Sequence, residues 1–114
     1  NWEVVPRYGI KIIDGVLYQH GDRGKGGQMA ALKNCMAEFR SVVQGHLHAQ
    51  SGLWYYANHK KTDEGGRVFG MQVGCGVDHS RAAMDYGLKF NAKPIVSCGV
   101  VLDGRVPHVI PMEL

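Results

Sequence analysis

The chain has 114 residues, of which 45% are hydrophobic and 20% are charged. These fractions are close to the averages of globular proteins and predict a single domain over residues 1–114. The net charge of +3 and the pI of about 8.9 suit an anionic partner, but they argue against a dedicated nucleic-acid binder, and the lack of a long apolar run excludes a membrane-spanning helix.

The first predicted element is a β-hairpin. Two short apolar runs flank Asp14-Gly15, which is a typical two-residue turn between strands. The second strand covers residues 16–19 and ends at His20. A loop with four glycines in seven residues, Gly21 to Gly27, follows it.

A helix and a further strand come next. Apolar residues recur at helical spacing between Gln28 and Arg40, with alanines between them, and this pattern predicts a helix. Residues 41–44 are typical of a short buried strand. The order of strand, loop, helix and strand predicts a parallel βαβ unit.

The rest of the chain is strand-like. Glycine, asparagine and aspartate separate the apolar stretches, and Asp103-Gly104 is typical of a hairpin turn between the last two. A short helix is expected over Ser80 to Tyr86. The predicted fold class is therefore α/β, a βαβ unit followed by antiparallel strands. These strands are expected at residues 53–57, 68–73, 95–102 and 106–110.

The cysteines indicate a cellular compartment. Cys35, Cys75 and Cys98 lie far apart, and their odd number favours reduced thiols in a cytoplasmic protein. No C-x-x-C spacing occurs, so we predict core thiols instead of a zinc site. The chain opens on Asn1 without a methionine or a polar lead, which is typical of a chain cut from a longer one.

Histidines stand where both strands of the βαβ unit end. His20 follows the first strand and His46 the second, and sites in open α/β sheets gather at the carboxyl ends of strands. On an extended backbone His48 would project to the same side as His46. Neutral imidazole is a common ligand for Zn, Mn, Fe and Ni ions, although two exposed loop histidines would give the same pattern.

The order of these motifs resembles a known family. Tyr18-Gln19-His20-Gly21, a helix, and then Gly45-His46-Leu47-His48 resemble the C-terminal half of a calcineurin-like metallophosphoesterase, a four-layer sandwich. The later segments Gly74-Cys75-Gly76, Asp85-Tyr86-Gly87 and 94–103 resemble the closing strands of phage and bacterial members. The resemblance covers nearly the whole chain.

The resemblance implies a binuclear site for divalent Mn, Zn, Fe or Ni. His20 and His46 would ligate one ion and His48 the other, and the pair would clamp a phosphoester for hydrolysis. The implied activity is that of a phosphatase, phosphodiesterase or nuclease, with a nucleotide or a nucleic acid among the candidate substrates.

The chain also departs from the family. The N-terminal motifs Asp-x-His, Gly-Asp-x-x-Asp-Arg and Gly-Asn-His-Glu are absent, and Gly21-Asp22-Arg23-Gly24 is not their equivalent. We therefore expect the domain to be partial, with its N-terminal half in cis or on another chain, and with weak metal binding and little activity alone. Activity in this chain alone would point to Asp22 and Asp78 as the first candidates for the missing negative charge.

A non-catalytic module is the alternative. An exposed parallel sheet edge, where the absent strands would pair, would lead such a module to bind a partner or to form a homo-oligomer.

The glycine loop allows two interpretations. Its backbone N–H groups could cradle phosphate, with Arg23 as the better side-chain contact because its planar guanidinium binds two oxygens. The other interpretation is a mobile, solvated loop with positive φ at several positions. A mildly basic nucleic-acid binder using Arg23, Lys25 and Trp54-Tyr55-Tyr56 is a third function, although a packed strand explains the aromatic residues equally well.

Overall fold

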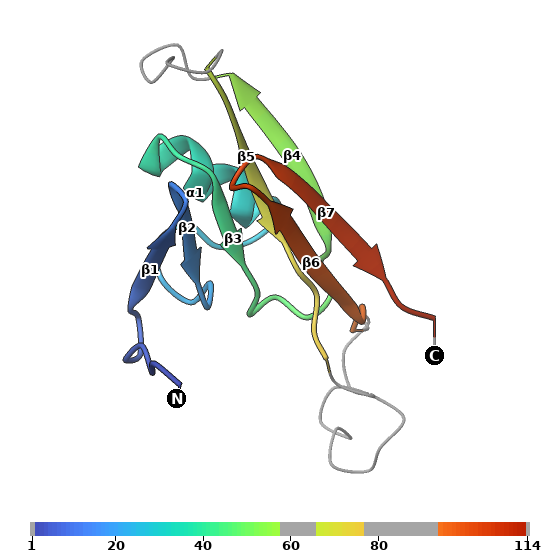
Figure 1. Ribbon diagram of the computed structural model, residues 1–114. Coiled ribbons are helices and arrows are strands. Elements are labelled where there is room, and N and C mark those ends of the chain that lie inside the picture. The colour runs from blue at the N-terminus through green and yellow to red at the C-terminus, as the bar shows by residue number, and fades with distance from the viewer. Residues whose placement is uncertain (1, 58–65, 77–93, 114) are drawn as a thin grey trace.

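The computed structural model describes residues 2–57, 66–76 and 94–113 (Figure 1). These residues form one helix and seven strands, which confirms a mixed α/β fold made mostly of strands. Five strands make one sheet in the order β1-β2-β3-β5-β4, and β6 and β7 make a second sheet. The elements are β1 (Ile10–Ile13), β2 (Val16–Gln19), α1 (Ala30–Glu38), β3 (Val42–Gln44), β4 (Gly52–Ala57), β5 (Arg67–Gln72), β6 (Ser97–Leu102) and β7 (Val106–Pro111).

Strands β1 and β2 form the predicted antiparallel hairpin. Ile13 pairs with Val16 across the turn Asp14-Gly15. The φ angles of the two turn residues are 51° and 79°, and positive φ at both positions is what a tight type I′ turn requires. Asp-Gly adopts this backbone at low cost, so the turn and the register of the hairpin are determined locally.

The parallel βαβ unit is also confirmed. Strand β3 pairs in parallel with β2 on one side and with β5 on the other. Helix α1 is shorter than the predicted range of 28–40, because Met29 and Phe39 adopt left-handed backbone with φ of 57° and 55°. The carboxyl ends of β2, β3 and β5 therefore lie at one edge of the sheet (Figure 1).

The five-stranded sheet has a hydrophobic core on each face. Leu17 and Val42 pack against Cys35 of α1 on one face, and the β6–β7 sheet covers the other. Each fully buried aliphatic side chain contributes about 1.5–3 kcal/mol relative to an exposed one, so the two cores hold three layers together. The second core contains Val16, Phe69 and Met71, with Val101 and Val109 from β6 and β7.

The prediction of core thiols is correct for two cysteines and wrong for the third. Cys35 and Cys75 are buried, whereas Cys98 is exposed. Cys98 pairs with Ile110 on the face of the β6–β7 sheet that turns away from Val101 and the core. The alternation of side chains along a strand therefore places this thiol outside.

The predicted exposed parallel edge is not found in the part of the chain that the structure describes. The outermost strands of the larger sheet are β1 and β4, and both pair antiparallel with their neighbours. The hairpin explains this difference, because β1 covers the outer edge of β2. The aromatic segment Trp54-Tyr55-Tyr56 lies within β4, where Tyr56 packs against the helix-side core.

Some predictions lie outside the described residues. They include the short helix at Ser80 to Tyr86, together with Asp78. Among residues 2–57, 66–76 and 94–113 the only helix is α1, with nine residues, and no helix there is long and apolar enough to cross a membrane.

Candidate metal centre

Two histidines meet at the edge where the parallel strands end. His20 follows β2 and His46 follows β3 by two residues. Backbone hydrogen bonds continue the strand pairing past the strand ends, since Gly45 N–H donates to His20 O at 2.8 Å and Val73 N–H donates to Gln44 O at 2.9 Å. The backbone thus fixes the two histidines beside each other before their side chains are considered.

The rings of His20 and His46 are in direct contact. His20 Nε2 lies 3.1 Å from His46 Nδ1, with the ring centroids 4.9 Å apart and the planes at 66°. Two nitrogens that bind one ion at 2.0–2.1 Å lie about 2.9–3.4 Å apart for ligand angles between a right angle and the tetrahedral value. Both side chains are exposed, so a cation can reach them. The separation also fits a hydrogen bond between the neutral rings, and the donor set fits a divalent cation.

The backbone at His46 is a tight turn and not a strand. Leu47 N–H donates to Gly45 O at 2.9 Å, and His46 has a φ of 71°. This three-residue turn with positive φ is rare and strained. The prediction that His46 and His48 project to the same side assumed an extended backbone, and that assumption is wrong.

His48 is held by its backbone beyond this turn. Its carbonyl accepts a hydrogen bond from Ile95 N–H at 2.8 Å, and its side chain is exposed. In the described ranges, no group of three His, Cys, Asp or Glu side chains is arranged to hold one metal ion. The structure therefore brings together two of the three predicted ligands.

A row of three glutamines, of which Gln44 and Gln72 are buried and Gln19 is half-buried, supports the histidine pair. Gln19, Gln44 and Gln72 end the three parallel strands and pair with one another in register. Gln19 Nε2 donates to Gln44 Oε1 at 2.8 Å, and Gln44 Nε2 donates to Gln72 Oε1 at 3.1 Å. Gln72 Nε2 then donates to Gly45 O at 2.6 Å, just before the histidine turn. Buried amides of this kind are stable only when their polar atoms are paired, so the row fixes the strand ends.

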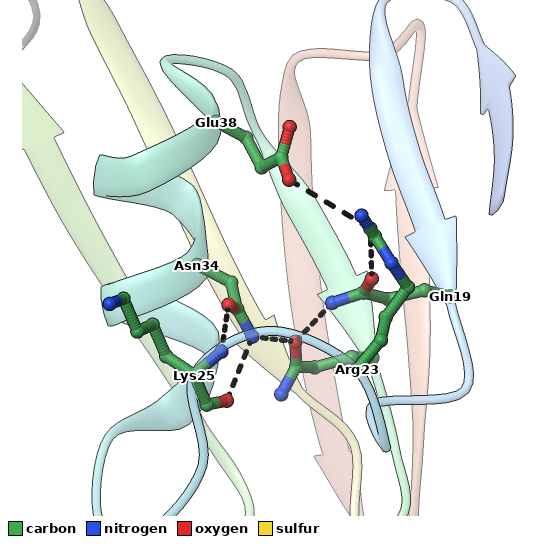
Figure 2. A network of polar contacts seen from close by, with 6 residues as sticks. Gln19, Arg23, Lys25, Asn34 and Glu38 are labelled. Atoms are coloured by element: carbon green, nitrogen blue, oxygen red, sulfur yellow. Dashed lines mark hydrogen bonds and ion pairs between the residues drawn. The ribbon is translucent and has the colours of Figure 1, made fainter. Parts of the chain in front are cut away.

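Asn34 of α1 joins this row to the glycine loop (Figure 2). Asn34 Nδ2 donates to Gln44 Oε1 at 2.8 Å and to Lys25 O at 3.1 Å, and Asn34 Oδ1 accepts from Lys25 N–H at 2.7 Å. The loop has positive φ at Gly21, Gly24 and Gly27, as predicted. The amide of Asn34 therefore pins the middle of the loop to the helix.

Arg23 is engaged within the same network. Its Nη1 donates to Gln19 Oε1 at 3.1 Å and lies 3.8 Å from Glu38 Oε1 (Figure 2). The guanidinium would have to leave these partners to contact a phosphate. The role of Arg23 as a phosphate ligand stays a prediction, and the contacts observed here are structural.

No pattern in the sequence predicted the cleft that borders the histidine pair. It has a volume of about 580 Å³. Asp22 lines it, with Oδ1 buried and without a hydrogen-bond partner and Oδ2 3.9 Å from Arg7 Nε. The turn at residues 6–9, with its positive φ, and the β1–β2 hairpin bring the N-terminal segment to this edge. The lining residues are Val5, Pro6, Arg7, Tyr8, Gly9, Lys11, Tyr18, Gln19, His20, Asp22 and His46.

Comparisons with protein-family models, curated proteins and solved structures found no match for this chain. The resemblance to metallophosphoesterases thus rests on its short motifs alone.

Proposed function

We propose that this chain is the C-terminal part of a metallophosphoesterase-type domain and contributes histidine ligands for divalent cations to a phosphoester hydrolase. The observation that carries the proposal is the 3.1 Å separation of His20 Nε2 and His46 Nδ1 at the carboxyl edge of three parallel strands. His20 and His46 hold one Mn, Zn, Fe or Ni ion, and His48 serves the second ion of a binuclear centre. The substrate is a phosphoester, and the activity is that of a phosphatase, phosphodiesterase or nuclease.

The chain's own residues hold and orient the cation ligands. The glutamine row and the Gly45–His20 backbone bond keep the two rings at ligand spacing, and neutral imidazoles supply the lone pairs. The chemistry that a bound divalent ion supplies in such enzymes is Lewis-acid stabilisation of the phosphoryl oxygens. Imidazoles carry no negative charge to offset two divalent ions, so carboxylates from an N-terminal half, in cis or on another chain, complete the site.

The outer face of the β6–β7 sheet also supports a partial domain. The described residues form three layers: α1, the five-stranded sheet and the β6–β7 sheet. Apolar side chains on the outer face of the third layer are roughly half exposed, and an apolar patch of this kind is unusual on the surface of a complete soluble domain. A four-layer sandwich would cover this face. The side chains are Val100, Leu102, Val106 and Ile110, which are 39–51% exposed.

Metal binding by histidine variants tests the proposal. We expect His20→Ala and His46→Ala each to lower the affinity for Zn²⁺ or Mn²⁺ by more than about tenfold, since even the loss of an outer-shell partner often costs 10–100-fold. Isothermal titration calorimetry and metal analysis after dialysis measure this effect. His108→Ala is the matched control, because His108 is an exposed histidine on β7.

Two outcomes of that experiment decide the assignment. His48→Ala should leave the first binding step unchanged in this chain, because the structure does not bring its side chain to the pair. Equal metal retention by wild type, His20→Ala and His46→Ala would refute the ligand assignment. A parallel phosphodiesterase assay is expected to show little activity for the chain alone.

A non-catalytic partner-binding or oligomerising module is the second candidate function. The same exposed outer face of the β6–β7 sheet favours it, since a large apolar patch often marks an interface. Sedimentation equilibrium separates the two functions. A stable metal-independent oligomer without divalent-cation binding would favour the module over the hydrolase.

A further inference from the structure

A small-molecule cleft opens directly beside the histidine pair. Its volume is about 580 Å³, within the 300–1,000 Å³ typical of ligand pockets. His20 and His46 line it together with Tyr8 and Tyr18. The cleft thus places aromatic side chains beside the proposed metal site. The N-terminal segment leads to the same edge of the sheet (Figure 1).

Tyr8 is held in this cleft by a strained turn. Gly9 N–H donates to Pro6 O at 2.8 Å, which makes Tyr8 the third residue of a four-residue turn, and its φ is 63°. Positive φ at this position favours glycine, and for a bulky aromatic residue it is an outlier. The side chain is 54% exposed, so burial in a core does not compensate for the strain. Strain of this kind is often kept where a side chain serves a ligand.

Cationic groups line the same cleft. The guanidinium carbon of Arg7 lies 4.9 Å from the centre of the Tyr8 ring, and the Arg7 side chain is 79% exposed. Its described ion pair is the long 3.9 Å contact with Asp22, so its remaining N–H groups can reach an anion. Lys11 also lines the cleft, where it binds Glu3 at 2.8 Å.

We infer that this cleft binds a nucleoside monophosphate, with the base stacked on Tyr8 and the phosphate directed to Arg7 and the histidine pair. The inference rests on the proposed function for the placement of the phosphate, and it narrows the substrate class to nucleotides. A sugar phosphate would satisfy the cationic groups but has no aromatic ring to stack on Tyr8. Stacking on an aromatic side chain is the usual way in which proteins hold a base without reading its sequence.

Ligand arms and a strain-relieving variant test the inference. Calorimetry on the whole chain compares adenosine 5′-monophosphate with ribose 5-phosphate, with and without Zn²⁺. Tyr8→Gly should weaken nucleotide binding by about 5- to 150-fold, the range that base–aromatic stacking implies, and should leave ribose 5-phosphate binding unchanged. The melting temperature of Tyr8→Gly should stay equal or rise, because glycine relieves the positive φ. If Tyr8 only supported the fold, Tyr8→Gly would lower the melting temperature together with nucleotide binding.

The protein offers a matched control pair and a rescue variant. Arg67 lies over the Tyr55 ring at the same 4.9 Å, away from the residues that line the cleft, so Tyr55→Ala should leave nucleotide binding unchanged. Tyr8→Phe keeps the ring and should bind the nucleotide within about twofold of wild type. Equal affinity of wild type for the nucleotide and ribose 5-phosphate, or an equal loss in Tyr8→Gly and Tyr55→Ala, would overturn the inference.

The failure of this inference is distinguishable from failure of the proposed function. Metal affinity in the His20→Ala and His46→Ala variants tests the hydrolase site without any nucleotide. Metal binding that depends on these histidines, combined with no preference for the nucleotide, would reject the nucleotide cleft and keep the metal centre.

Discussion

Polar side chains, and not apolar ones, occupy the last position of the three adjacent strands beside His20 and His46. Gln44 is 1% exposed and Gln72 is 0% exposed, yet their amides are paired along the row. A single unpaired amide there would cost about 1–3 kcal/mol, so the row tolerates few substitutions. The row therefore holds the strand ends in register directly beneath the histidine pair.

Asn34 offers the sharpest test of this network. Asn34→Leu keeps a side chain of similar branched shape but leaves Lys25 N–H and Lys25 O without their Asn34 partner and removes one of the two donors to Gln44 Oε1, so we expect the free energy of unfolding to fall by about 1–3 kcal/mol. Urea denaturation followed by circular dichroism measures the loss. Lys33→Leu, at the exposed neighbouring position of α1, is the control and should change stability by less than about 0.5 kcal/mol. Similar values for the two variants would contradict a structural role for the network.

Two of the six described non-glycine residues with positive φ lie at this edge. His46 and Tyr8 both have positive φ, 71° and 63°, and both line the cleft. In each case a backbone hydrogen bond between residues two or three apart in the chain closes the turn that holds the side chain. Non-glycine residues in this conformation typically cost about 1–3 kcal/mol, so the surrounding contacts have to hold these two turns in place.

At the scale of elements, the close approach of α1 to β5 depends on one glycine. A Cβ at Gly70 would contact the carbonyl oxygen of Ala31 and would lie 2.6 Å from Ala31 C and 2.7 Å from Leu32 N. These are backbone atoms, which cannot move aside as the end of a flexible side chain can. The absence of a side chain at Gly70 therefore sets how closely the helix layer lies against the sheet.

Substitution of Gly70 tests this packing. Gly70→Ala should lower the free energy of unfolding by about 1–3 kcal/mol or more, because the added methyl group displaces α1 from the sheet. Gly26→Ala is the control, since a Cβ there meets nothing within 4 Å and no positive φ is involved. Thermal and urea unfolding of both variants give the comparison. An unchanged Gly70→Ala protein would mean that α1 can move without cost.

At the scale of the whole molecule, the helix-side core is sensitive to high pH. Cys35 is fully buried between α1 and the sheet, and this burial raises the pKa of its thiol to about 11. The unfolded chain loses the thiol proton near the ordinary value of about 8.5. Between these values the folded state binds more protons than the unfolded state, so stability falls as the pH rises.

Unfolding at several pH values tests this linkage. The free energy of unfolding of wild type should decline from about pH 8.5 to pH 11 more steeply than that of Cys35→Ala. Cys98→Ala removes an exposed thiol and should keep the slope of wild type. Parallel curves for wild type and Cys35→Ala would show that the Cys35 thiol does not contribute to the pH dependence.

The sequence alone determined the local elements and the order of the candidate site residues. Hydrophobic periodicity, together with Asp14-Gly15 and Asp103-Gly104, predicted both hairpins, the helix and the parallel βαβ unit, because these depend on neighbours in the chain. The same pattern placed His20 and His46 at strand ends. Their role as metal ligands remains a prediction.

Only the tertiary structure decided how these pieces make a site. The positive-φ turn at His46 separates His48 from the pair, although an extended backbone had been expected there. The pairing of β3 with β5 brings Gln72 beside Gln44, 28 residues away in the chain, and the folding of the N-terminal segment brings Tyr8 to the histidines. These contacts depend on the register and packing of distant segments, which the periodicity of a local stretch does not encode.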